Sequence, residues 1–243
     1  MTDESLTPGA SPDVDGGAGT SDRTLVEDLL LVLFQSSGGV FAGETTLYYV
    51  LAGGVLAELG LDGRVATEPG ALGTTRVAAT GDTPPDDELL RTAWEYVRER
   101  PHNVQTVLAA VGPELRARVL ARLLEHGDLR EVQRKVLGII PTKVLELGDT
   151  GRHEGLISKV RAVLVDGATP TPRLAALIAL LSGSGTLSWF HRDIPWTSPV
   201  ITRAKELERG DWGAGAAAEA VTRTMVAIIT SSLVAALAIQ ARK

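Results

Sequence analysis

Two hydrophobic runs separated by a glycine-rich break open the patterned part of the chain. In "TLVEDLLLVLF", Thr24 is followed three residues later by Glu27, which is the capping-box pattern of a helix N-terminus. A helix is therefore predicted to begin near Leu25 and to end at the Ser-Ser-Gly-Gly break. The second run, residues 44–59, is apolar on nearly every side and predicts a helix buried inside a bundle, with Gly60 at its end.

Two stretches rich in β-branched residues interrupt the helical pattern. Residues 64–68 and 74–80 contain Val, Thr and Ala and flank "PGALG", which predicts a small β-hairpin. Residues 129–147, "LREVQRKVLGIIPTKVLEL", have β-branched residues on both sides of a central "GIIP". This second stretch predicts another pair of strands joined by a turn.

The remaining patterned segments are helical. "PPDDELLRTAWEYVRER" has proline and acids in its first turn and arginine in its last, which predicts a helix. A short helix is predicted at residues 104–111, and Gly112-Pro113 is expected to open a separate helix that ends at Gly127. Further helices are predicted near residues 155–165, 172–181, 200–208 and 216–240. The predicted fold class is therefore mainly α, a single helical-bundle domain over residues 23–243 with two small β-hairpins.

The last of these helices is long and apolar enough to raise the question of a membrane span. Residues 224–241 carry no charge, and their length reaches the lower edge of what a span requires. The segment nevertheless contains Ser, Thr and Gln and lacks an aromatic belt. We interpret it as a buried core helix.

The N-terminal residues 1–22 differ from the rest in composition and charge. They carry five acidic and no basic residues, are rich in Gly, Ser and Pro, and contain no aromatic side chain. Such a segment buries too little apolar surface to offset its ordering entropy, so we expect a disordered acidic tail. Because the whole chain has a formal net charge of -6, the body that remains is nearly neutral, which does not favour a nucleic-acid partner.

Candidate catalytic and metal-binding groups are sparse. The four histidines lie in separate segments without metal-ligand spacing, and "SGSGT" at residues 182–186 lacks the lysine of a phosphate-binding loop. Asp86 and Asp87 lie in the first turn of a helix, where acids complement the helix dipole. The absence of cysteine excludes disulfides and thiolate sites, and no signal-peptide pattern is present, so a cytoplasmic protein is expected. The sparse polar groups further predict a protein without metal, cofactor or catalysis.

Basic residues gather in the middle of the chain. Residues 116–143 contain seven basic and three acidic side chains, together with the apolar hairpin sequence "VLGIIP". Cationic groups beside exposed apolar residues are what a peripheral membrane site requires. The same pattern is also typical of a solvated helix face with salt bridges and a buried hairpin, and the sequence leaves both interpretations open.

The order of these segments resembles the Golgi phosphoprotein 3 family. The likeness is carried by "TLVEDLLLVLF", "GGVLAELGLDGRV", "RARVLARLLEHGDL", "GLISKVRAVL" and "RLAALIALL", and it spans residues 24–181. The resemblance implies a single, mostly helical domain that binds phosphatidylinositol 4-phosphate at membranes. In eukaryotes, members of this family also link Golgi membranes to the tails of glycosyltransferases.

The resemblance also implies where a lipid headgroup would bind. The family pocket uses a tryptophan, an arginine on the second helix and two arginines on the later Arg-rich helix. These four positions correspond here to Gly43, Ala52, Pro113 and Arg116, so only the last one matches. Arginine holds a headgroup phosphate by charge-assisted hydrogen bonds, and two of the family arginines are missing here. The resemblance is therefore stronger support for the fold than for the ligand.

We therefore expect a peripheral protein that binds anionic, phosphoinositide-like headgroups at the inner membrane face. The high Ala, Gly, Val and Arg content resembles proteins from GC-rich bacteria. An adaptor of the same fold that has lost lipid binding is the alternative, and an enzyme is less favoured. A protein cargo and a homo-oligomer formed through the hairpin are further expected partners. The headgroup-binding residues are expected to be Arg116, Arg134 and Lys135, and the residues that insert into the membrane or self-associate to be Val136, Leu137, Ile139 and Ile140.

Overall fold

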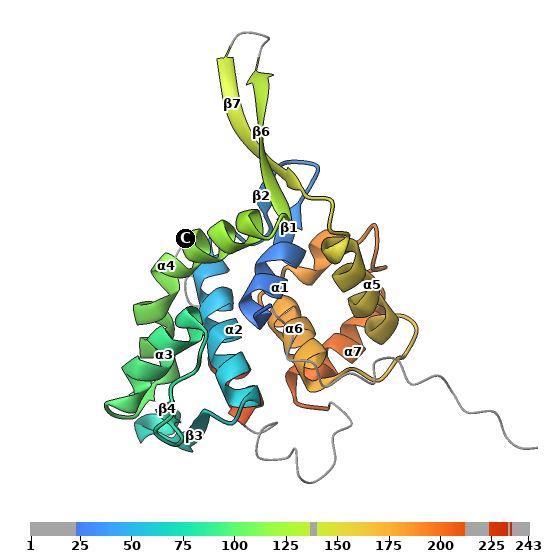
Figure 1. The fold of residues 1–243 in the computed structure, drawn as a ribbon. Coiled ribbons are helices and arrows are strands. Elements are labelled where there is room, and N and C mark those ends of the chain that lie inside the picture. Colours follow the sequence, from blue (N-terminus) through green and yellow to red (C-terminus); the bar gives the residue numbers. More distant parts are fainter. Residues whose placement is uncertain (1–22, 137–139, 212–223, 233, 235–243) are drawn as a thin grey trace, which may run out of the picture.

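Helices make up most of the computed structural model, which confirms the mainly α prediction (Figure 1). The structure describes residues 23–136, 140–211, 224–232 and 234, so the acidic tail and much of the last predicted helix lie outside it. The α-helices are α1 (Leu25–Leu33), α2 (Leu47–Leu61), α3 (Glu88–Arg98), α4 (Val104–Glu125), α5 (Arg152–Leu164), α6 (Pro172–Gly183) and α7 (Ser198–Glu208). Residues Ala71–Gly73 and Leu187–Phe190 form the short 3-10 helices η1 and η2.

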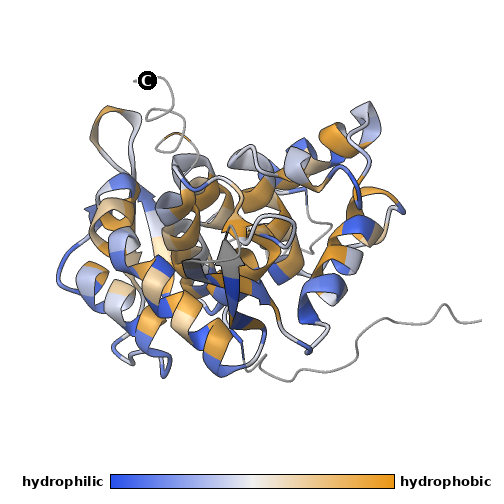
Figure 2. Cartoon of the chain, turned by 90° about the horizontal axis from the view of Figure 1, so that it is seen from above, coloured by the Kyte–Doolittle hydropathy of each residue, from blue (hydrophilic) through white to orange (hydrophobic). Residues whose placement is uncertain are grey.

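The core is built around α1, α2 and α6. Every residue of α1 is buried, and its start has the predicted capping box, in which Thr24 and Glu27 hydrogen-bond to each other's backbone N–H. Helix α2 is apolar all round, and most of its residues are buried between α1, α4 and α6, as predicted for a central helix. Figure 2 shows hydrophobic residues along the central helices and hydrophilic residues mainly at the periphery.

Gly60 does not end α2. The helix continues to Leu61, and Gly63, with a φ of +67°, takes the left-handed position after the helix end. A Cβ at Gly60 would lie 3.1 Å from the sulfur of Met225, so this glycine makes room for the helical segment 224–232. The buried side chains of that segment, Met225, Ile228 and Ile229, make its described part a core helix. None of the described helices combines the length and the apolar character needed to cross a membrane.

Helix α4 is continuous, which corrects the predicted break at Gly112-Pro113. Proline removes one backbone donor, but the carbonyl it would have bonded belongs to Ala109, whose residue is exposed and can be solvated. Buried Leu108 and Leu115 hold the helix on both sides of the proline. A Cβ at Gly112 would lie 2.8 Å from the backbone oxygen of Tyr48, so the glycine allows α4 to pack closely on α2.

The two predicted hairpins are present, and the structure adds further short strands. The strands are β1 (Phe34–Gln35), β2 (Val40–Phe41), β3 (Val65–Pro69), β4 (Thr75–Ala79), β5 (His102–Asn103), β6 (Leu129–Val136) and β7 (Ile140–Leu147). Strand β5 pairs with β4, and β1 pairs with β2 across the glycine-rich break. Each of these unpredicted strands has only two residues, too few for an alternating pattern to be visible. The β6–β7 hairpin extends away from the helices (Figure 1).

Buried ion pairs join the base of the β6–β7 hairpin to the helices. Asp128, just before β6, accepts hydrogen bonds from Thr150 at 2.7 Å and from Arg152 at 2.6 Å. Arg152 at the start of α5 also donates to Asp28 of α1 at 2.5 Å. Since Asp128 is almost fully buried, it depends on these donors, and the hairpin base is thereby fixed to α1 and α5.

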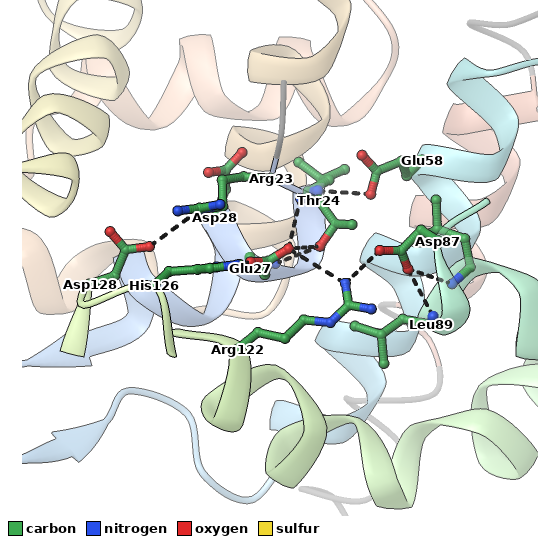
Figure 3. Close-up of polar contacts among 12 residues, drawn as sticks. Arg23, Thr24, Glu27, Asp28, Glu58, Asp87, Leu89, Arg122, His126 and Asp128 are labelled. Atoms are coloured by element: carbon green, nitrogen blue, oxygen red, sulfur yellow. Dashed lines mark hydrogen bonds and ion pairs between the residues drawn. The ribbon is translucent and has the colours of Figure 1, made fainter. Parts of the chain in front are cut away.

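A second set of ion pairs involves Glu27 and Glu58. Figure 3 shows the contacts of Glu27 with its neighbours from α3 and α4. Glu27 is 1% exposed and faces Arg122 and His126 of the α4 end, and Arg122 also pairs with Asp87 at the start of α3. Arg173 of α6 donates to Asp28 at 2.9 Å and to Glu58 at 2.5 Å. Burial raises the pKa of Glu58, and the nearby Arg173 opposes that rise. These contacts tie α1 to α2, α4 and α6.

Replacing Gly112 with alanine is expected to lower the free energy of unfolding by about 1–3 kcal/mol, because the new methyl group would overlap the α2 backbone. Urea denaturation followed by circular dichroism measures this change. Gly155→Ala in α5 is the matched control, since its added Cβ would meet no atom within 4 Å beyond its chain neighbours and the backbone of its own helix. The control should be neutral or stabilising by up to about 1 kcal/mol. Equal losses in both variants would contradict the close packing of α2 and α4.

Arg173→Met is expected to destabilise the protein by about 3 kcal/mol at pH 7, because two buried carboxylates lose a shared cation. Arg173 opposes the rise in the pKa of Glu58 that burial causes, so the pKa rises further in the variant. A folded-state pKa above the unfolded value means that stability is lost as pH increases past the unfolded value, and the variant loses more than the wild type. The deficit should therefore be smaller at pH 5 than at pH 7 in urea denaturation. Arg161→Met, which breaks only the exposed pair with Asp166, should cost no more than about 1 kcal/mol.

Candidate membrane-binding surface

The β6–β7 hairpin is the most prominent projection of the described structure (Figure 1). Its eight-residue strands pair from Leu129↔Leu147 at the base to Val136↔Ile140 near the tip, a length of about 25 Å. In the described part of the chain, β6 and β7 pair only with each other. The outer edge of each strand therefore presents backbone donors and acceptors that no other strand satisfies.

Cross-strand ion pairs occupy the basic side chains of the hairpin. Arg134 of β6 donates to Glu146 of β7 at 3.0 Å through Nε, and Lys143 donates to Glu131 at 2.7 Å. The hydrogen bond from Arg134 lowers the pKa of Glu146, and the hydrogen bond to Glu131 raises the pKa of Lys143. Arg134, Lys143 and Glu131 are exposed to solvent and Glu146 is partly exposed, so water and ions compete with these pairs.

The predicted hairpin-tip residues lie at the limit of the description. Leu137 and Ile139 are outside the described residues, and only the backbone pairing of Lys135, Val136 and Ile140 is described. Insertion or self-association through the tip therefore stays a prediction. Of the three predicted headgroup-binding residues, the structure places the side chains of Arg134 and Arg116.

Arg116 lies on α4 and contacts β2 and the connection between β2 and α2 rather than the hairpin. Its Nε lies 3.0 Å from Glu44, and its guanidinium lies 5.3 Å from the centre of the Phe41 ring, a cation–π contact. Among the described residues, no recorded contact joins Arg116 to Arg134. A shared pocket of Arg116, Arg134 and Lys135 therefore stays a prediction, and a ligand at Arg116 must compete with Glu44.

The position that corresponds to the family tryptophan is closed by another segment. Gly43 has a φ of +70°, and a Cβ there would lie 2.6 Å from the side chain of Thr186, just before η2. Ala52 is buried in α2, and Pro113 lies inside α4. Of the four positions that the resemblance implies, only Arg116 carries a cation here.

Two open cavities lie elsewhere on the surface. One, of about 460 Å³, is formed by the β1–β2 turn and η2, and we call it the Trp189 cavity; it is lined by Gln35, Ser37, Gly38, Val40, Ser188, Trp189, His191 and Arg192. The other, of about 530 Å³, lies beside the β3–β4 hairpin near Arg76, Arg100 and His102. Sequence patterns indicated neither cavity, although "SWFHRDIPW" places two tryptophans and an arginine within nine residues and could have drawn attention to the first.

Metal-ligating side chains are not grouped in the described part of the chain, where no three His, Asp or Glu residues are placed to share an ion. His153 is half-buried, and burial lowers the pKa of its imidazole. The buried carboxylates Glu27, Asp28 and Glu58 are each engaged with arginines from other helices. These three carboxylates therefore link helices, and neither they nor His153 line either cavity.

Comparison with known proteins identifies the chain at the level of its family. The family model described as Golgi phosphoprotein 3 (GPP34) matches residues 25–224, which covers α1 to α7 and all of the strands. A search of characterised individual proteins found no significant match. The matched region extends well beyond the resembling segments that end at residue 181, and it includes η2 and the Trp189 cavity. The chain therefore belongs to the Golgi phosphoprotein 3 family.

Proposed function

We propose that this protein is a peripheral membrane protein that binds anionic, phosphoinositide-like lipid headgroups and performs no catalysis. The observation that carries the proposal is the projecting β6–β7 hairpin, whose strands contain four basic residues against two acidic ones. An extended cationic element at the edge of a helical body can approach an anionic surface without distorting the core. Family membership supports the same function.

Binding would combine electrostatic attraction with shallow insertion. Arg116, Arg134 and Lys135 supply the cations that contact phosphate groups, and each basic residue near an anionic surface contributes about 1 kcal/mol. The apolar tip sequence Val136, Leu137, Ile139 and Ile140 supplies side chains for the membrane interface. The location implied is the cytoplasmic side of the inner membrane, with association that weakens as salt rises.

A protein-interaction adaptor of the same fold is the second candidate function. Two observations favour it: Arg116 and Arg134 are already paired with carboxylates, and the hairpin edges lack partner strands in the described structure. Such edges accept an added strand from a protein cargo or from a second copy of the chain. This candidate predicts a bound protein or a concentration-dependent oligomer and no preference among lipids.

Flotation with liposomes tests the proposal through two substitutions with opposite effects. Arg116→Gln should weaken binding to vesicles containing phosphatidylinositol 4-phosphate about fivefold, because one cation is lost. Glu44→Gln should strengthen binding, because it removes the carboxylate that neutralises Arg116. Arg161→Gln on α5 also removes an exposed, paired arginine and is the matched control.

Vesicles of neutral lipid, phosphatidylinositol and cardiolipin complete the comparison, each at low and moderate salt. Binding that is unchanged by Arg116→Gln and Glu44→Gln would remove Arg116 from the binding surface. Failure of the wild-type protein to float with any vesicle, even at low salt, would contradict the membrane function. Sedimentation of the wild-type protein and of a hairpin-edge variant would then test the adaptor function.

A further inference from the structure

The segment that follows α6 presents two tryptophans to solvent. Leu187, Phe190 and Ile194 are buried and anchor η2 and the following turn to the core. Trp189 and Trp196 face outward and are 54% and 44% exposed. Tryptophan combines a large apolar surface with a polar N–H, so an exposed tryptophan in a well-anchored segment is suited to contact at a polar–apolar interface.

This segment lies on the hairpin side of the molecule. Its beginning packs against the end of β2, since a Cβ at Gly43 would meet the side chain of Thr186. The β1–β2 turn also packs against β7, since a Cβ at Gly39 would lie 3.2 Å from the backbone oxygen of Leu145. Figure 1 shows β1 and β2 beside the hairpin base. The Trp189 cavity therefore opens next to the element that the proposed function assigns to the membrane.

The lining of the Trp189 cavity has the chemistry of a site for a phosphorylated polyol. Ser37 and Ser188 provide hydroxyl groups, Gln35 provides an amide, and Arg192 and His191 provide nitrogen donors. None of the described residues that line the cavity is acidic. Its volume of about 460 Å³ falls within the range of pockets that hold small polar molecules.

Arg192 differs from Arg116 and Arg134 because no carboxylate neutralises its charge in the described structure. In the described part of the chain, Arg192 makes no recorded hydrogen bond or ion pair, whereas Arg116 and Arg134 are paired with Glu44 and Glu146. A guanidinium has five donors that suit bidentate contact with a phosphate group. An unpaired arginine in a cavity without acids therefore offers an anion more than the paired arginines do.

We propose that the Trp189 cavity is an additional binding site for the phosphate-bearing headgroup of an anionic membrane lipid. Arg192 contacts the phosphate, the two serines and Gln35 contact the polyol hydroxyls, and Trp189 and Val40 lie at the lipid interface. This inference rests on the proposed membrane function and assigns it a second site, distinct from Arg116 and the hairpin. The exposed apolar rim favours a membrane lipid over a free phosphate compound, which would leave Trp189 and Val40 in water.

Substitutions in the two surface cavities separate this site from general electrostatic attraction. Arg192→Gln should reduce flotation with phosphatidylinositol 4-phosphate vesicles about tenfold, and Trp189→Ala should reduce it several-fold. Arg100→Gln is the matched control, because Arg100 lines the other cavity, is exposed and likewise has no recorded partner among the described residues. The melting temperature should be the same for all three variants, since the replaced side chains are exposed.

The outcomes distinguish the inference from the proposed function. Wild-type binding that Arg116→Gln weakens but Arg192→Gln and Trp189→Ala leave unchanged would overturn the Trp189 site and keep the membrane function. Equal losses in Arg192→Gln and Arg100→Gln would also overturn it, because net charge alone would then account for binding. If the wild-type protein floats with no vesicle, it is titrated with soluble inositol phosphate while its tryptophan fluorescence is measured. This titration tests whether the phosphate group comes from a soluble compound and not from a membrane lipid. An Arg192-dependent response would replace the lipid by a soluble ligand, and no response would overturn the site.

Discussion

Two adjacent carboxylates on a buried helix set the conditions under which the other helices assemble. Glu27 and Asp28 lie in the first turn of α1, where they favour the helix dipole, yet α1 has no exposed residue. A buried carboxylate without a cation is costly, so arginines must reach α1 from elsewhere. Arg122, Arg152 and Arg173 come from α4, α5 and α6. The positions of three helices around α1, and of the hairpin base beside it, therefore follow from neutralising this one turn.

Local sequence patterns were sufficient to predict those helices and strands that contacts between neighbouring residues determine. The capping box of Thr24 and Glu27, the all-apolar α2 and the strands around "GIIP" could be predicted because neighbouring residues determine them. Glycine and proline misled where their role is tertiary. Gly60 and Gly112 allow other helices to approach closely, and Pro113 stays within a helix that buried residues hold on both sides. No local signal distinguishes such a glycine from one that ends a helix.

The candidate binding surface was harder to predict because it depends on contacts between residues that are distant in the sequence. A count of basic residues pointed to 116–143, but whether a cation is available depends on acids that are distant in sequence, as Glu44 is from Arg116. Resemblance located four family positions without revealing that Thr186 packs against the first of them. Arg192 lay outside the basic cluster, although it has no recorded partner in the described structure. The pairing of a charge, rather than its position in the sequence, determines what the charge can attract.

The length of the hairpin also restricts how the molecule can meet a flat membrane. The β1–β2 turn packs near Leu145, five residues after Ile140 at the start of β7, so the Trp189 cavity lies roughly 17 Å from Ile140 along the strands. A hairpin perpendicular to the bilayer would keep the cavity beyond the reach of a headgroup unless the tip penetrated the hydrocarbon. A hairpin that lies at a shallow angle to the membrane surface would allow the hairpin and the Trp189 cavity to contact the membrane together. Simultaneous contact thus defines a tilt angle for the whole protein, and the α3 and β3–β4 end would then face away from the lipid at a fixed orientation.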